Sequence, residues 1–280
     1  MTESLKDISP EAIWHTHIFK SSLPMRMRLQ EILNSLGNTK FYTCLDIGSD
    51  NAMVTYHLRK HGGTWHSLVM NKNEGSAIRE VVKDNVRVFK GMPLPFGDKT
   101  FDVVVVLNEL ERVESDEAFI EECHRILKPD GKIIVTVERK KVITIIPSFR
   151  RLLGLSHEKR EMYRPGYTES QLFSILKHGF DVYNLRTYCR FSVVFTESLA
   201  RFFVKLFSRN EDEFNEKVRR VYSVARVFYA FAAQLDMLLF LTKGYQMIAA
   251  AKRRAWRPRE APVLTDGRSI TEAVLSRAPK

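Results

Sequence analysis

The sequence predicts an α/β protein built on a mostly parallel sheet. From about residue 40 to residue 140, short apolar runs of strand length alternate with segments of helical periodicity. One run, FDVVVVLN at 101–108, is almost continuous in valine, which is typical of a strand buried on both faces. Strands that alternate with helices are joined by right-handed crossovers, so we expect parallel neighbours in this region.

The elements of this region follow in order. Residues 1–24 are expected to form an irregular lead-in. RMRLQEILNSLG (26–37) has apolar residues at helical spacing and ends at Gly37. SDEAFIEECHRILKPDG (115–131) predicts a helix that Ser115 caps and that ends at Pro129 to Gly131. Apolar runs predict five strands, which are FYTCLDI (41–47), SLVM (67–70), VRVF (86–89), FDVVVVLN (101–108) and KIIVTV (132–137).

The second half of the chain has a different pattern. TESQLFSILKHGFDV (168–182) predicts a helix, a glycine stop and a sixth strand, and KGYQMIAAAKRR (243–254) predicts the last strand. Between them, roughly 192–241 is helical and strongly apolar. We therefore divide the chain into a lead-in and helix (1–39), a core (40–190), a helical insertion (191–242), the last core strand (243–255) and a C-terminal arm (256–280).

The net charge of +11 is unevenly distributed. Residues 1–138 hold 17 Lys and Arg against 20 Asp and Glu, and residues 139–280 hold 27 against 13. A basic half of this kind suits an anionic partner such as lipid headgroups, nucleic acid or a phosphorylated substrate, but it also suits a solubilising surface. The basic residues lie among large aliphatic residues without a nucleic-acid motif, which argues against nucleic acid.

The cysteines exclude two classes of site. Cys44, Cys123 and Cys189 are scattered and form no C-x-x-C pair, so we predict neither a disulfide framework nor a metal site. The first twelve residues are polar, which predicts no cleaved leader. Reduced cysteines and the absence of a leader favour the cytoplasm.

Four motifs in series resemble the class I S-adenosylmethionine-dependent methyltransferases, in the branch that acts on small molecules and lipids. They are LDIGS (45–49), LPFGDKTFDVVVVLNELERV (94–113), ECHRILKPDGKIIVTV (122–137) and YTESQLFSILKHGFDV (167–182). The resemblance implies a Rossmann-like, doubly wound, seven-stranded, mostly parallel sheet with a helical insertion before the last strand. It also implies S-adenosylmethionine as cofactor, bound at the carboxyl ends of the strands.

The resemblance also implies site residues. In this family the loop after the first strand holds the methionine end of the cofactor, the end of the second strand holds the ribose, and the loop after the third contacts adenine. The matching positions here are Asp46, Gly48, Ser49 and Asp50, then Met70 and Asn71, then Met92. Substrate meets cofactor at the end of the fourth strand, which makes Asn108 and Glu109 the candidate catalytic residues.

The chain departs from the family at several of these positions. Asp50 and Ala52 replace expected glycines, Met70 or Asn71 replaces the ribose-binding acid, and Arg112 stands where many relatives have histidine. An unmatched buried donor costs roughly 1–3 kcal/mol, so several losses predict weakened cofactor binding.

Three of the candidate residues also have a purely structural interpretation. Asp46 suits bonds to neighbouring backbone groups as well as a bond to the ligand. Asn71 suits capping of the following turn. Glu109 suits a solvated position at the start of a helix.

The apolar additions suggest the partner. SLARFFVKLFSR (198–209) is a basic amphipathic helix that suits a membrane interface or a long apolar substrate. VYSVARVFYAFAAQLDMLLFL (221–241) is interrupted by Arg226, Gln234 and Asp236, so it is a poor transmembrane span. These helices are expected to pack on each other as a lid, on a second copy in a homodimer, or on a membrane. The residues with heptad-like spacing are Val221, Val224, Phe228, Phe231, Leu235 and Leu238.

The sequence thus predicts methyl transfer from S-adenosylmethionine to a hydrophobic or lipid-linked small molecule, by a cytoplasmic or peripheral membrane enzyme. The alternative is a methyltransferase-like binding or scaffold protein without catalysis. Binding of the cofactor separates the two hypotheses.

Overall fold

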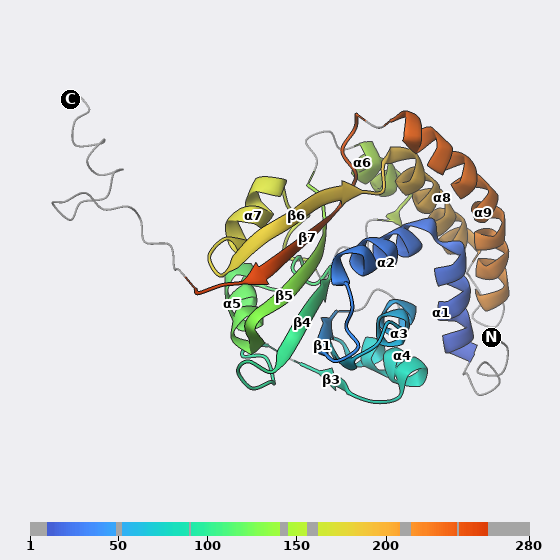
Figure 1. Cartoon of the computed structure of the whole chain (residues 1–280). Coiled ribbons are helices and arrows are strands. Elements are labelled where there is room, and N and C mark those ends of the chain that lie inside the picture. The colour runs from blue at the N-terminus through green and yellow to red at the C-terminus, as the bar shows by residue number, and fades with distance from the viewer. Residues whose placement is uncertain are drawn as a thin grey trace, which may run out of the picture.

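The computed structural model describes most of the chain (Figure 1). The described residues are 10–48, 52–89, 91–140, 145–155, 162–207, 214–239 and 241–256. They form one seven-stranded sheet covered by helices on both faces, with an additional pair of long helices beside it (Figure 1). The predicted C-terminal arm at 256–280 lies outside these residues, except for Trp256.

The sheet has the strand order β3-β2-β1-β4-β5-β7-β6. Its first five strands are parallel, and β7 runs antiparallel to both β5 and β6. This confirms the predicted seven-stranded, mostly parallel α/β architecture. The strands are β1 (Thr43–Ile47), β2 (Thr64–Val69), β3 (Val86–Val88), β4 (Phe101–Leu107), β5 (Leu127–Glu138), β6 (Phe180–Tyr188) and β7 (Gln246–Arg253).

Helices cover the two faces of the sheet. One face packs against α5 (Asp116–Ile126) and α7 (Glu169–Leu176). The other face packs against α1 (Pro10–Ser21), α2 (Leu23–Leu36), α3 (Ala52–Lys60) and α8 (Phe191–Phe207). The remaining helices are α4 (Lys72–Val82), α6 (Ile145–Leu152) and α9 (Phe214–Leu238).

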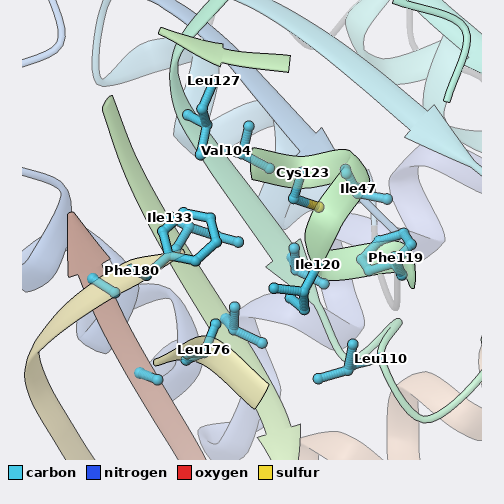
Figure 2. Packing of buried hydrophobic residues seen from close by; sticks show 14 of the residues in the cluster. Ile47, Val104, Leu110, Phe119, Ile120, Cys123, Leu127, Ile133, Leu176 and Phe180 are labelled. Atoms are coloured by element: carbon cyan, nitrogen blue, oxygen red, sulfur yellow. The ribbon is translucent and has the colours of Figure 1, made fainter. Parts of the chain in front are cut away.

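The valines of β4 explain this layered packing. Val104 and Val106 join the cluster under α5 and α7, whereas Val103 and Val105 join the cluster under α2 and α3, and all four are fully buried. Figure 2 shows part of the first cluster, where side chains of α5 and α7 meet those of β1, β4 and β5. A strand that is apolar on both sides therefore forms the centre of the molecule.

The boundaries of α5 agree with the sequence at one end and differ at the other. The Ser115 side chain accepts a hydrogen bond from the Ala118 N–H, which confirms the predicted N-cap. The helix ends at Ile126, however, and LKPDG belongs to β5. Pro129 excludes the helical conformation from the residue before it, so the chain becomes extended earlier than we expected.

The expectation of an irregular lead-in over 1–24 is wrong for its described part, since residues 10–21 form α1. In α1, Phe19 is buried against the core, and α1 lies beside α9 (Figure 1). Packing against helices more than 170 residues away explains this result, because no local sequence pattern reports such a contact.

A buried carboxylate joins the helices beside the sheet. Glu197 of α8 accepts hydrogen bonds from the hydroxyls of Tyr222 (3.2 Å) and Tyr229 of α9 and of Ser22 (3.2 Å) between α1 and α2. The Arg201 guanidinium lies 3.0 Å from the same carboxylate. This cluster fixes α8 and α9 against the amino-terminal helices.

Candidate cofactor site

The candidate site lies at the carboxyl ends of β1, β2 and β4. Backbone hydrogen bonds continue one residue beyond β1 and one residue beyond β4. The Gly48 N–H donates to Leu68 O over 2.8 Å, and the Asn108 N–H donates to Thr136 O over 3.0 Å. The first residues of the site are thereby held by the sheet itself.

Asp46 lies fully buried beneath this edge. Its two carboxylate oxygens accept hydrogen bonds from Thr55 Oγ1 of α3 (3.0 Å) and Ser67 Oγ of β2 (2.9 Å). Arg59 Nη2 donates in turn to Ser67 Oγ over 3.0 Å. Desolvation raises the pKa of Asp46 to about 6, against the opposing effect of the two hydroxyls. The carboxylate therefore ties β1 to β2 and α3.

This elevated pKa has a consequence for stability. Because the folded-state pKa of Asp46 is about 6 and its ordinary value is 3.8, the folded protein binds more protons between these values and loses stability as pH rises through them. We expect Asp46→Asn to remove this dependence of stability on pH. The free energy of unfolding of the variant minus that of the wild type, measured in urea, should therefore rise by about 1 kcal/mol from about pH 5 to about pH 7.5. A difference that does not change with pH would show that Asp46 keeps an ordinary pKa.

Gly48 is required by its surroundings. Its φ is +82°, and a Cβ built there would lie 2.5 Å from Glu109 Oε2 and 2.8 Å from Leu107 O. The loop after β1 and the turn after β4 therefore touch at this glycine. Ser49 and Asp50 lie outside the described residues. Ala52 opens α3 and is buried with Val69 and Ile78, so its methyl group belongs to the core.

Asn108 and Glu109 form the turn after β4. Asn108 has φ +49°, a conformation that asparagine tolerates, and its Oδ1 accepts a hydrogen bond from Thr136 Oγ1 over 2.8 Å. Glu109 is fully buried, which contradicts its interpretation as a solvated helix-start residue. The next acid, Glu111, is also fully buried and accepts a hydrogen bond from the Glu138 N–H.

A charged cluster connects this turn to α4. Arg112 Nη1 lies 3.5 Å from Glu109 Oε2 and donates to Glu74 Oε1 over 3.1 Å. Glu74 was not among the predicted site residues. The available signal was an acid in the first turn of the helix after β2, close to the position where the family has its ribose-binding acid. We define Glu74, Glu109 and Arg112 as the edge cluster.

The remaining predicted residues follow β2 and β3. Met70 directly follows β2 and packs partly against the core. The carbonyl of Asn71 accepts a hydrogen bond from the Gly75 N–H over 3.0 Å, so Asn71 begins α4. Met92 is 41% exposed on the loop after β3, and α5 holds this loop through a 2.8 Å hydrogen bond from the Leu94 N–H to Glu122. The structure thus brings Gly48 and Glu109 together but leaves Met92 at the surface.

Metal ligands are not gathered in this site. Within the described ranges, no group of three His, Cys, Asp or Glu side chains is arranged to hold a metal ion.

In a comparison with known protein families, one family model matches part of the core of the chain. Residues 45–135 match a family model described as a methyltransferase domain. A demethylmenaquinone methyltransferase from Lactobacillus johnsonii is 31% identical over 74 residues, which are 22% of this chain and 30% of that protein. The ubiquinone/menaquinone biosynthesis C-methyltransferase UbiE from Roseobacter denitrificans is 25% identical over 100 residues, which are 32% and 40% of the two chains. The chain thus spans well under half the length of either relative.

Solved structures share the fold over most of the chain. The [4+2]-cyclase SpnF aligns with a TM-score of 0.57 at 14% identity, covering 82% of this chain and 81% of that one. A sarcosine dimethylglycine methyltransferase, so named in its structure from Galdieria sulphuraria, aligns with a TM-score of 0.55 at 17% identity over 84% and 87%. The match of residues 45–135 to the methyltransferase-domain model and the observed strand order both agree with the resemblance of the motifs.

Proposed function

We propose that this protein transfers a methyl group from S-adenosylmethionine to a hydrophobic or lipid-linked small molecule. The observation that carries the proposal is the junction of Gly48 with Glu109 at the carboxyl edge of a methyltransferase domain. In sheets of this type, ligands bind outside the carboxyl ends of the strands, where the strand order reverses. Here that reversal lies between β1 and β4, next to both residues.

The charges of this edge suit the proposed cofactor. Gly48 itself is buried, and a Cβ there would meet Glu109 and Leu107, so only glycine lets the loop after β1 approach the turn after β4 this closely. The carboxylates of Glu74 and Glu109 both pair with the Arg112 guanidinium, so these three side chains together carry one net negative charge, which suits a cationic ligand. S-adenosylmethionine supplies a methyl group already activated on a cationic sulfonium.

We assign proposed roles on this basis. Gly48, Ser49 and Asp50 form the loop that holds the cofactor, and Asp46 positions this loop through its bonds to Thr55 and Ser67. Met70, Asn71 and Met92 surround the nucleoside, as the resemblance implies.

Asn108 and Glu109 are the proposed catalytic residues. Since Thr136 fixes its amide oxygen, Asn108 offers its amide nitrogen to orient the acceptor. Glu109 takes up the proton that an acidic acceptor loses, if the acceptor needs a base.

The proposed acceptor class rests on two observations. The curated relatives named above act on quinone-type molecules according to their names. In addition, α6 and α8 lie beyond the carboxyl edge and carry exposed apolar side chains, among them Leu152, Phe203 and Leu206. Peripheral contact of the protein with a membrane surface is part of the same proposal, because quinone-type acceptors reside in lipid.

One observation favours the alternative of a binding protein without catalysis. The carboxylate of Glu109 lies directly over Gly48, and Arg112 pairs with two acids of the site, so the protein's own groups engage the place where the cofactor is expected. The fold is also shared by a protein named as a cyclase, so the fold alone assigns no methyl transfer.

Calorimetric titration with S-adenosylmethionine and S-adenosylhomocysteine tests the proposal. We expect dissociation constants on the order of micromolar, which corresponds to about −8 kcal/mol. Transfer of a labelled methyl group to a demethylmenaquinone analogue then tests the acceptor class. Absence of binding up to about millimolar ligand (−4 kcal/mol), in a protein that melts cooperatively, would leave the binding-protein alternative.

A further inference from the structure

The helix α9 has two faces of different character. Its buried side is formed by small residues and tyrosines, namely Val218, Tyr222, Ala225, Tyr229 and Ala232, which pack towards α8 and α1. The residues of the predicted heptad pattern therefore do not form the packed side. Most of them face solvent, which differs from the expected packing of a lid.

The opposite side of α9 carries a continuous apolar surface. We define the α9 stripe as Val224, Val227, Phe228, Phe231, Leu235 and Leu238. Apart from the adjacent pair Val227 and Phe228, these residues follow one another at intervals of three or four, so they share one side of the helix. Val227 is 72% exposed and Leu238 is 77% exposed, which is unusual for contiguous large apolar side chains on a surface.

The exposed charged side chains that the structure describes on α9 are all basic. Residues 217–241 contain four basic residues and a single acid, Asp236. Asp236 is buried and accepts hydrogen bonds from the Ser192 and Val193 N–H groups at the start of α8. Arg219 and Arg226 are exposed and lie seven residues apart, on the same flank of the stripe.

We propose that the α9 stripe, with Arg219 and Arg226, docks on the surface of an anionic lipid bilayer. An apolar face flanked by cations lies in the boundary between headgroups and acyl chains, where each basic residue near the surface contributes to binding. A second copy of the chain fits less well, because a symmetric dimer would bring Arg219 and Arg226 of one copy towards the same arginines of the other. In the part of the chain that the structure describes, no helix has the length and hydropathy to cross a bilayer.

The position of α9 relates this surface to the site. α8 and α9 connect the end of β6 to the start of β7, and the start of β7 pairs with Glu138 at the carboxyl end of β5. Arg150 of α6 also donates to Ser198 Oγ of α8 over 2.9 Å. Docking through α9 therefore holds the carboxyl edge near the lipid in which the acceptor class of the proposed function dissolves. This part of the inference rests on that proposed function.

The first test is co-sedimentation of the full chain with vesicles of phosphatidylcholine containing about a third phosphatidylglycerol. We expect Phe228→Ser with Phe231→Ser to lower vesicle affinity by at least about tenfold, because two exposed rings leave the interface. The matched control is Phe41→Ser with Phe173→Ser, since these rings are 88% and 47% exposed on other elements. The control pair should bind as the wild type does.

The second test removes charge without touching the stripe. We expect Arg219→Gln with Arg226→Gln to lower affinity for the anionic vesicles by about 25-fold, at roughly fivefold for each arginine. The control is Lys60→Gln with Lys177→Gln, two exposed lysines on α3 and at the end of α7. Circular dichroism melts confirm that all variants are folded.

Several outcomes overturn the proposal. Failure of the wild type to sediment with anionic vesicles would do so, as would equal binding by the stripe variants and the wild type. A wild-type dimer in light scattering that becomes a monomer in the phenylalanine variant, without vesicle binding, would assign the stripe to a second copy instead. Titration of the wild type and of the phenylalanine variant with S-adenosylhomocysteine keeps the two proposals apart. A wild type that binds vesicles but no cofactor would contradict the proposed function and would still support docking through the α9 stripe.

Discussion

Gly48→Ala should abolish measurable binding of S-adenosylhomocysteine. The added methyl group would lie 2.5 Å from Glu109 Oε2 and 2.8 Å from the carbonyl oxygen of Leu107, which is backbone within the sheet and cannot move aside. The residue would also keep a φ of +82°, which costs roughly 1–2 kcal/mol for a residue with a Cβ. The loop after β1 must therefore shift, and calorimetry should show a loss of affinity of about hundredfold or more.

The control for this variant is Gly97→Ala. A Cβ at Gly97 would lie 3.6 Å from Thr100 Oγ1, an ordinary contact on the loop before β4. This variant should bind the cofactor as the wild type does. Wild-type affinity in a folded Gly48→Ala protein would remove this glycine from the site, and the junction with Glu109 would then be a packing feature.

Glu197→Ala should cause the largest loss of stability in the helices beside the sheet. The substitution leaves the hydroxyls of Tyr222, Tyr229 and Ser22 without their shared acceptor and removes the carboxylate that pairs with Arg201. Breaking a buried charged cluster by removing one member costs about 3–5 kcal/mol. Urea unfolding monitored by circular dichroism measures the change.

An exposed acid provides the comparison. Asp181 lies 3.1 Å from Arg254, but its side chain is 75% exposed, so Asp181→Ala should cost less than about 1 kcal/mol. Equal effects of the two substitutions would show that the buried carboxylate contributes no more than a surface ion pair.

The contribution of Glu197 should also depend on pH. Burial alone would raise the pKa of Glu197, but Arg201 and the tyrosine hydroxyls outweigh burial and hold it below the ordinary value of 4.5. The stabilisation is therefore complete at neutral pH and is lost as the pH falls below this value. The difference in stability between the wild type and Glu197→Gln should shrink in acid.

The predictable part of the fold is the part that local sequence encodes. The valine run of β4 and the Ser115 cap of α5 both depend on residues close in the chain, and both are confirmed. The helix α1 was missed because its stability comes from packing against α2 and α9. The early start of β5 was missed because the helical periodicity continues to Leu127, whereas Pro129 disfavours the helical conformation of the residue before it.

The candidate site was predictable in position but not in its contacts. Gly48 and Glu109 were both named from the motifs, yet only the three-dimensional structure brings them together across β1 and β4. Asp46 accepts bonds from Thr55 and Ser67, nine and twenty-one residues away, which single-sequence patterns do not report. Glu74 was missed because it lies in the first turn of α4, a few residues beyond the end of β2 where the ribose-binding acid is expected, and its contact with Arg112 is visible only in three dimensions.

The place of β7 in the sheet has a consequence for how the chain is made. β7 lies between β5 and β6 but follows both in the sequence, separated from β6 by α8 and α9. A ribosome therefore completes β5 more than a hundred residues before the strand that covers its edge. During that interval β5 presents unpaired backbone groups, which is the state most prone to misassociation between nascent chains. Chaperone demand during synthesis should accordingly end only when residues 246–253 leave the exit tunnel.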